Sequence, residues 1–438
     1  MRTPELKAMR PALEAVPGFG RLLSRLRRNG QPAWLVGGVL RDWVLGRPLV
    51  DIDLAVGQDC EPLARRLATE GDGSWFWLDR ERGQCRVVLS DEAGRTFCYD
   101  LSPFKGGSLL ADLGERDFTI NAMALPLDEA EGRLVDPYGG MRDLAGKRLR
   151  VTTPGVMQQD PLRILRGLRF ARILEFDFDP LTFELMKRAA PTMIDLPGER
   201  VSMELALILS LPLRRKLLAE IERLHLFASL GLKKVGFWST PEEQTRIQAL
   251  EAAIAAVPER LAARDIAGGW SAAALVRLHL LLKAPDEDAV RALAARLRLP
   301  RNALKALLGL HRLENLSLPP VPATSRRRRL WLQQLPGHPG CCLLHFLAFG
   351  RQGESDASGP ALLAADALAL AAGEIPPPLV PATELAAELG IARGPLVGRL
   401  LQRLVSAEIA GLVDDRTEAI DWLKKELEMG IDKGSNPT

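Results

Sequence analysis

The chain has 438 residues, of which 47% are hydrophobic and 26% charged, a composition of globular and not of disordered proteins. Its 58 Lys and Arg against 55 Asp and Glu give a net charge of +3, which permits a polyanionic partner without requiring one. No apolar run reaches the length of a membrane span and no signal region follows Met1, so we expect a cytoplasmic protein that does not contact a membrane.

The part of the chain from about residue 30 to 150 mixes strand patterns with a helix. Short runs rich in β-branched and aromatic residues predict strands at Ala33–Val36, Ile52–Val56, Trp75–Leu78, Cys85–Leu89 and Thr96–Leu101. A helical pattern covers 59–70. These elements predict a mixed α/β domain.

Beyond Pro161 the sequence becomes almost wholly helical and is rich in Leu, Ala and Arg. Prolines separate the expected helices at Pro180, Pro197, Pro212 and Pro300. Proline-rich stretches at 318–322 and 375–381 predict breaks between helical subdomains. The last residues, 433–438, are expected to be frayed.

The cysteines and histidines argue against two kinds of site. No two cysteines form a Cys-x-x-Cys pair, which favours reduced thiols. The cysteines are Cys60, Cys85, Cys98, Cys341 and Cys342. The histidines lie far apart in the sequence, and none is followed by an aspartate. They are His225, His279, His311, His338 and His345. We therefore expect neither a histidine-based hydrolase nor a zinc site.

Two aspartates in the segment 49–56 carry the strongest chemical signal. Asp51 and Asp53 are two residues apart in an expected strand, so they project from one face, while the alternating apolar residues pack on the other. This face could hold divalent metal ions, although an ordinary strand end with solvated acids has the same pattern. Just upstream, Gly37 and Gly38 follow an expected strand and precede an expected helix. This order is typical of a phosphate-binding turn, and equally of a simple turn.

Further polar residues lie downstream. Asp100 ends another expected strand and could supply a third acid, or could start a turn. Arg116 could pair with phosphate as a planar fork. Asp117 and Asn121 would share a helix face and could contact ribose hydroxyls, although Asp117 as a helix cap explains the same pattern.

The helix expected from Asp160 opens with an acid as N-cap and a proline as first helical residue. Its arginines advance by three positions and so turn around the helix, at Arg163, Arg166, Arg169 and Arg172. We expect one or two of them to serve a ligand and the rest to form a solvated or salt-bridged face.

The order of these motifs resembles a known family. The segments 35–42 with 51–53, 116–122, 136–140 and 160–166 resemble the successive motifs of class II tRNA nucleotidyltransferases and bacterial poly(A) polymerases, and 198–205 resembles a fifth. The resemblance covers roughly 33–210. It implies an α+β fold in which a polymerase-β-like nucleotidyltransferase head is followed by an elongated all-α neck, body and tail.

The resemblance also implies boundaries and roles. The head would span 1–150, the neck 151–210, the body 211–325, the tail 326–430 and a frayed terminus 431–438. Asp51 and Asp53 would hold Mg²⁺, with Asp100 as the third catalytic acid. The nucleotide-binding residues would be Gly37, Gly38, Arg41, Arg116, Asp117, Asn121, Asp160, Arg163 and Arg166.

In the family, an acid and an arginine of the neck read the incoming base. Asp160 would accept from the exocyclic amine of C or A, and Arg163 would donate to the ring, which implies selection of CTP and ATP. The chain departs from the family pattern in three places. Gln159 replaces an acid, Glu115 replaces an arginine before Arg116, and the stretch 100–116 is shorter than the flexible loop of enzymes that add all three nucleotides. The short stretch resembles CC-adding enzymes.

The implied partner is tRNA, which the protein would bind at the 3' end and the acceptor half. The segment 381–419 resembles the tail of such enzymes, which contacts backbone phosphates. The run Arg326–Arg329 could add phosphate contacts, although a solvated face is the expected role of such a run. The implied function is template-independent addition of C, or of C and A, to the 3' end of tRNA from CTP and ATP. If A is not added, a second enzyme would complete the CCA end. The alternatives are a poly(A) polymerase, a catalytically silent RNA-binding protein and a small-molecule nucleotidyltransferase.

Overall fold

The computed structural model describes residues 3–28, 30, 32–57, 59–127, 132–232, 238, 240–316, 321–350 and 360–429. The chain divides into two compact units, Met1–Leu196 and Pro197–Thr438. The division into head, neck, body and tail stays a prediction, and its frayed terminus at 431–438 and the linker residues 318–320 lie outside the described residues.

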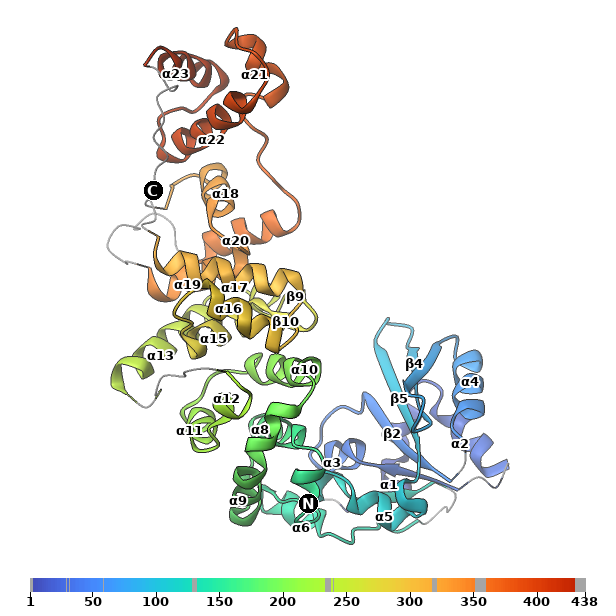
Figure 1. The fold of residues 1–438 in the computed structure, drawn as a ribbon. Helices are drawn as coiled ribbons and strands as arrows, with labels where there is room; N and C mark the ends of the chain where they lie inside the picture. Colours follow the sequence, from blue (N-terminus) through green and yellow to red (C-terminus); the bar gives the residue numbers. More distant parts are fainter. Residues whose placement is uncertain are drawn as a thin grey trace. The chain divides into compact units, whose positions relative to one another are not determined.

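The first unit is built on a six-stranded sheet with the order β3-β4-β5-β2-β1-β6 (Figure 1). β2 and β5 pair in parallel and the other neighbours are antiparallel. The strands are β1 Ala33–Val36, β2 Asp51–Val56, β3 Ser74–Asp79, β4 Gln84–Ser90, β5 Thr96–Pro103 and β6 Ala124–Pro126. The five predicted strands are confirmed to within two residues, whereas β6 was not predicted.

The expected alternation along β2 is confirmed. Ile52, Leu54 and Val56 are fully buried, whereas Asp51 is exposed and Asp53 half-buried. The apolar side chains therefore fix the face from which the two acids project. The predicted helix at 59–70 is also confirmed, because α4 Glu61–Glu70 packs on β3 and β4. A shorter helix, α3 Gly38–Val44, packs on β1 and β2 (Figure 1).

Helices precede and follow the sheet in the first unit. Two of them precede the sheet, α1 Leu6–Glu14 and α2 Phe19–Arg28. The elements after β5 are η1 Lys105–Gly107, α5 Leu109–Gly114, η2 Thr119–Asn121, α6 Gly140–Ala145, β7 Arg148–Leu149, α7 Val156–Gln159, α8 Leu162–Leu174, β8 Asp177–Phe178, α9 Pro180–Ala189 and η3 Ala190–Asp195.

The start of α8 differs from the prediction by one residue. Leu162 is the first helical residue and Pro161 is the N-cap, so Pro161 does not occupy the first helical position. Asp160 still satisfies a helix N–H, because its Oδ1 accepts from the Leu162 nitrogen at 3.2 Å. The reason for the shift is α7, which ends directly before Asp160 and leaves that residue in an extended conformation.

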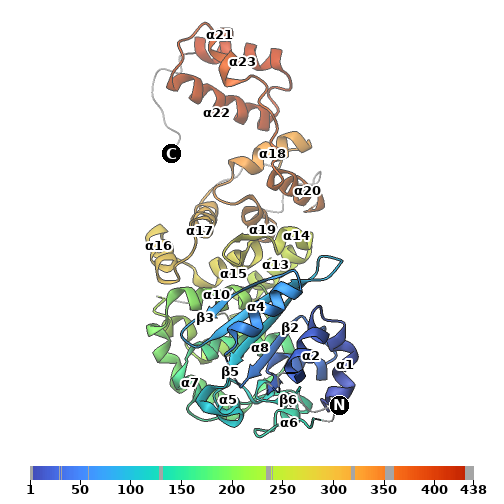
Figure 2. The ribbon, with the colours of Figure 1, turned by 90° about the vertical axis from the view of Figure 1, so that its right-hand side faces the viewer.

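The second unit is almost wholly helical, as predicted, with one small two-stranded sheet. Its elements are α10 Gly198–Leu209, α11 Arg215–Arg223, α12 Leu226–Ser229, α13 Pro241–Ala255, α14 Glu259–Ala262, β9 Asp265–Ala267, β10 Trp270–Ser271, α15 Ala272–Leu282, α16 Glu287–Arg296, α17 Arg301–Glu314, α18 Ser325–Gln334, α19 Pro339–Phe349, α20 Pro360–Ala371, α21 Ala382–Glu388, α22 Pro395–Ala410 and α23 Arg416–Glu428. The last three helices gather around a small apolar core (Figure 2).

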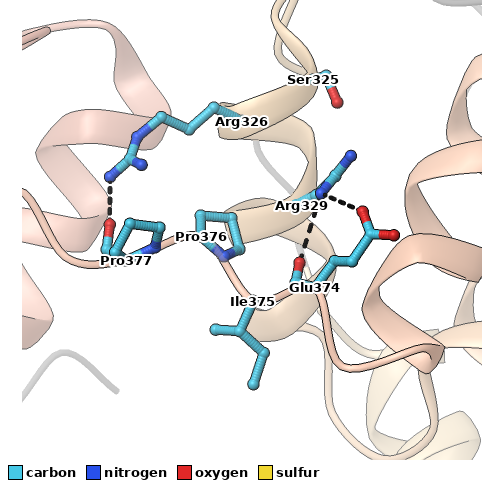
Figure 3. A pocket seen from close by; sticks show the side chains of 7 residues that line it. All are labelled: Ser325, Arg326, Arg329, Glu374, Ile375, Pro376 and Pro377. Atoms are coloured by element: carbon cyan, nitrogen blue, oxygen red, sulfur yellow. Dashed lines mark hydrogen bonds and ion pairs between the residues drawn. The ribbon is translucent and has the colours of Figure 1, made fainter.

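The basic run 326–329 lies in the first turns of α18 and does not form the solvated face that was expected. Arg328 is buried and binds Asp366 of α20 at 2.6 Å. Each of the other three arginines also pairs with an acid, Arg326 with Glu408, Arg327 with Asp414, and Arg329 with Asp366 and Glu374. Figure 3 shows Arg326 and Arg329 lining a surface pocket, with bonds to Pro377 and Glu374. The run therefore joins α18 to the helices and loops around it.

Two compositional predictions can be compared with the structure. All five cysteines are free thiols, as expected. In the described part of the chain, no helix combines the length and the apolar character needed to cross a membrane.

Candidate active site

The sheet brings three acids of the first unit together. β2 and β5 run in parallel with Asp53 opposite Asp100, and Asp51 lies two residues before Asp53 on the same face. Burial raises the pKa of Asp53 to about 6, and the neighbouring charges of Asp100 and Asp51 add to this effect while Arg116 opposes it. The pKa of Asp51 is also raised, mainly because the surrounding protein displaces part of the water around its carboxylate, although the residue as a whole is exposed. Clustered carboxylates with raised pKa values fit a divalent cation, because hard oxygen ligands and a local excess of negative charge are what such an ion requires.

Asp100 is held by an arginine that the sequence did not point to. Arg86 of β4 lies opposite Asp100 in the antiparallel β4–β5 pair, and its Nε and Nη2 atoms each donate to one carboxylate oxygen at 2.7 Å. The fork neutralises part of the charge of Asp100 and fixes its orientation beside Asp53. A carboxylate oxygen has more than one lone pair, so Asp100 keeps acceptor capacity toward a metal ion.

The paired glycines bring the backbone close to Asp53. Gly37 has φ +73°, a conformation that favours glycine, and a Cβ atom there would lie 2.8 Å from side-chain atoms of both Arg116 and Asp53. The Gly38 nitrogen donates to Asp53 Oδ2 at 3.2 Å. Arg116 is oriented by Asp112, to which it donates at 3.0 and 3.2 Å. The glycine turn, Asp53 and Arg116 are therefore in close contact beside the N-terminus of α3.

A chain of hydrogen bonds connects α3 with α8. Arg41 forks onto Asp42 at 2.8 and 3.0 Å and donates to Asn121 Oδ1 at 2.7 Å. The Asn121 amide donates to Asp117 Oδ1 at 3.0 Å, and Arg166 pairs with Asp117 Oδ2 at 2.8 Å. The predicted neighbours Asp117 and Asn121 therefore do lie together, although in and before the 3₁₀ turn η2 and not on an α-helix.

Asp117 is the buried centre of this chain of bonds. Its Oδ1 also accepts from the Phe118 nitrogen at 2.8 Å, and Arg166 donates to Oδ2 through Nε at 3.0 Å. Burial opposes ionisation of Asp117, but Arg166, the Asn121 amide and the Phe118 N–H together lower its pKa. Asp117 is therefore an ionised carboxylate whose lone pairs are used within the protein, so in this structure it positions Arg166 and Asn121.

The expected base-reading residues lie at the junction of α7 and α8. Asp160 is half-buried, and Arg163 donates to the carbonyl oxygens of Val156 at 3.1 Å and Glu115 at 2.7 Å. These bonds leave further N–H donors of the guanidinium available to a ligand. Gln159, the departure from the family pattern, is the last residue of α7.

The structure brings most of the predicted site residues into two connected groups. One group surrounds Asp53 and the other surrounds Asp117. Sequence reasoning missed Arg86, Asp42 and Asp112, which orient predicted residues. Period-two alternation along β4 puts Arg86 on one face of its strand, but only the strand pairing could have indicated that it faces Asp100. The short stretch before Arg116 folds as η1 and α5.

Several known proteins are similar to this chain. Residues 33–150 match the model of the poly(A) polymerase head domain. The chain is 31% identical over 429 residues to an A-adding tRNA nucleotidyltransferase of Deinococcus radiodurans, a match that covers 90% of this chain and 95% of that relative. It is 44% identical over 191 residues to a CC-adding tRNA nucleotidyltransferase of Geobacter sulfurreducens, where the match covers 44% of this chain and 43% of the relative.

The fold has the same relatives. A Thermotoga maritima CCA-adding enzyme solved in complex with tRNA aligns with 98% of this chain and 100% of its own length, with a TM-score of 0.67 and 23% sequence identity. This likeness concerns the arrangement of the chain in space, and it includes the helical remainder as well as the sheet.

Proposed function

The chain belongs to the tRNA nucleotidyltransferase family, and from this premise we propose that it transfers nucleotides from CTP, and in the alternative also from ATP, to the 3' end of tRNA without a template. The observation that carries the proposal is the placement of Asp51, Asp53 and Asp100 on one face of neighbouring parallel strands, beside the glycine turn and the N-terminus of α3. A nucleotidyltransferase of this family uses a divalent metal ion, and we assign Mg²⁺ because all of the candidate ligands are carboxylate oxygens.

The site residues divide the work of phosphoryl transfer. A divalent ion held by Asp51 and Asp53 would lower the pKa of the RNA hydroxyl and balance charge on the leaving pyrophosphate. We assign Gly37, Gly38 and Arg41 to the triphosphate; to hold it, the Gly38 N–H would exchange its bond to Asp53, and Arg41 its bonds to Asp42 and Asn121, for phosphate oxygens. The terminal 3'-hydroxyl of the RNA attacks the α-phosphorus, the bond to the bridging oxygen breaks, and pyrophosphate leaves. Positioning and fixed charge supply the acceleration, so no covalent intermediate is needed.

Base selection is assigned to the start of α8. The carboxylate of Asp160 would accept from the exocyclic amine of C or A, and Arg163 would donate to the ring with the N–H groups that do not bind main-chain carbonyls. Arg166, tied to Asp117, would help to hold this arrangement. The folded, short stretch between Asp100 and Arg116 supports addition of C only, in which case a second enzyme completes the CCA end.

We propose the 3' end and acceptor half of tRNA as the partner, contacted by the second unit. The family and the aligned full length support this assignment. Because Arg326–Arg329 are paired with acids, we do not assign phosphate contacts to them. A cytoplasmic location stays a prediction.

Incubation with tRNA that lacks its terminal nucleotides, with each NTP separately and with mixtures, tests the proposal. Stops after two C additions support a CC-adding enzyme, and a further A supports a CCA-adding enzyme. Long A tails with ATP alone would instead establish the poly(A) polymerase, the alternative that the shared head domain keeps open. Incorporation of no nucleotide into any RNA would contradict both.

A pair of variants tests which residues carry the reaction. Asp51→Asn and Asp53→Asn should abolish incorporation while tRNA binding persists, because they remove metal ligands and leave the second unit unchanged. Glu92→Gln, in the turn between β4 and β5, is the matched control because this acid is exposed and outside the site. Full activity of the two aspartate variants would show that these residues do not hold the catalytic metal ion. It would not distinguish tRNA nucleotidyltransferase from poly(A) polymerase.

A further inference from the structure

Helix packing in the second unit gathers two histidines and a glutamate at one point. His279 of α15, Glu314 of α17 and His345 of α19 each offer a ligand atom, and these atoms all lie within 4.8 Å of one another. The three helices contact one another in pairs. Separation along the sequence, from which no zinc site was expected, therefore does not keep these two histidines apart, because helix packing brings distant residues together.

The Nε2 atom of each imidazole is buried and faces Glu314 without a hydrogen bond of good geometry. His279 and His345 are 6% and 7% exposed. Their Nε2 atoms are buried without a hydrogen-bond partner, although they lie 3.3 and 3.7 Å from Glu314 Oε1. An unsatisfied buried polar group costs about 1–3 kcal/mol, so two such atoms aimed at one carboxylate require an explanation.

We propose that His279, Glu314 and His345 bind a divalent transition-metal ion, with zinc as the best match to the donors. Two imidazole nitrogens with one carboxylate oxygen are a recurrent zinc ligand set, whereas Mg²⁺ and Ca²⁺ prefer oxygen alone. Tetrahedral zinc with bonds of about 2.0–2.1 Å requires ligand atoms about 3.3–3.4 Å apart. The present separations of 3.3 and 3.7 Å to Glu314 are close to this value, and because the three ligand atoms lie within 4.8 Å of one another, the imidazoles would have to approach by at most about 1.5 Å.

The glutamate gives the site its access to solvent. The side chain of Glu314 is 37% exposed, so the carboxylate can rotate onto an ion and a water molecule can take the fourth position. Three protein ligands on three helices would join segments that are 35 and 31 residues apart in the sequence. Binding of the ion would therefore stabilise the second unit independently of the chemistry in the first.

An arginine of α13 faces this site. Arg246 of α13 lies 3.6 Å from Glu314 Oε1, with its guanidinium over the Phe349 ring at 5.1 Å. It competes for the carboxylate, so the alternative is an ion cluster in which protonated imidazoles share Glu314 with Arg246. Burial lowers the pKa of His345, which favours the neutral imidazole that a metal binds, whereas contacts from the two imidazoles lower the pKa of Glu314, which is what the ion cluster requires. The contact between Arg246 and Glu314 is also long for an ion pair, which leaves the carboxylate available.

Cobalt(II) titration of the full-length, chelator-treated protein tests the proposal, because tetrahedral Co²⁺ absorbs visible light much more strongly than octahedral Co²⁺. We expect an intense band that saturates at one equivalent and that zinc removes. His279→Gln and His345→Gln should lose the band, and Glu314→Gln should weaken binding at least about tenfold. Any ion held by the carboxylates of the first unit is in an oxygen environment and contributes only weak absorption.

His225→Asn is the matched control, because His225 is exposed and its left-handed backbone conformation is one that asparagine tolerates. Circular dichroism and retained nucleotide incorporation show that each variant is folded. Zinc should also raise the unfolding temperature of the wild type and the control, but not of the His279 variant. Absence of the band from the wild type, or a band of equal strength in the two cluster histidine variants, would overturn the proposal and favour the ion cluster.

Discussion

The raised pKa of Asp53 predicts that an isosteric amide stabilises the metal-free protein while it destroys activity. The pKa of this buried carboxyl is about 6 in the folded chain against 3.8 without the fold. The difference of about two pKa units corresponds to about 3 kcal/mol between the protonation states. Because the folded state binds the proton more tightly, the wild type loses this stability as the pH rises from about 4 to about 6 and does not regain it at higher pH.

Asp53→Asn cannot ionise, so at pH 7.5 in chelator its free energy of unfolding should exceed that of the wild type by up to about 3 kcal/mol. The gain should shrink through the same pH window and vanish below about pH 4. Saturating Mg²⁺ should stabilise the wild type and leave the variant unchanged, because only the wild type has the full ligand set. Loss of several kcal/mol of transition-state stabilisation should lower incorporation at least about a hundredfold.

Pulse proteolysis in urea, with fragments identified by mass spectrometry, measures unfolding of the first unit separately from the second. Glu92→Gln is again the control, and its stability should follow that of the wild type at every pH. A variant equal to or less stable than the wild type at pH 7.5 in chelator would refute the reasoning. So would a stability gain that persists at pH 4.

Three further substitutions test other contacts. Gly37→Ala should lower incorporation at least about tenfold, because the residue has φ +73° and the added methyl would lie 2.8 Å from site side chains; normal kinetics would contradict this. Arg86→Met should shift the pH midpoint of incorporation upward, because the charge of Arg86 opposes the rise in the pKa of Asp51, and an unchanged pH profile would show that Arg86 is only structural. Arg328→Met should destabilise the protein by less than the about 3–5 kcal/mol of an unpaired buried charge, because Arg329 and Ser325 still contact Asp366, and the double variant with Asp366→Leu should recover part of this loss in thermal unfolding; equal losses would argue against the pair.

Local patterns predicted the sheet and the acids well. Alternation along 51–56 identified both the strand and the face of Asp51 and Asp53, because a strand has only two faces and one of them is apolar. The same reasoning located four other strands. It could not find β6, because three residues carry too little of a periodic signal.

Contacts between distant residues could not be predicted in this way. Arg86 faces Asp100 through strand pairing, and His279 meets His345 through helix packing, and neither relation leaves a mark in the local sequence. The run Arg326–Arg329 shows the opposite difficulty, because four consecutive arginines look like a surface for polyanions until the acids from other helices are known. Fold-level packing decides which charged side chains remain available.

The hydrogen bonding of β2 restricts how this protein can change. β1 and β5 bond to both edges of the strand, so deletion of Ile52 would make the two aspartates neighbours in the strand and place them on opposite faces, one of which is the hydrophobic interior. Changes in length are tolerated only in the connections on either side. Evolution, or an engineer, can therefore adjust what the enzyme accepts by remodelling the loops, while the frame of this strand is preserved.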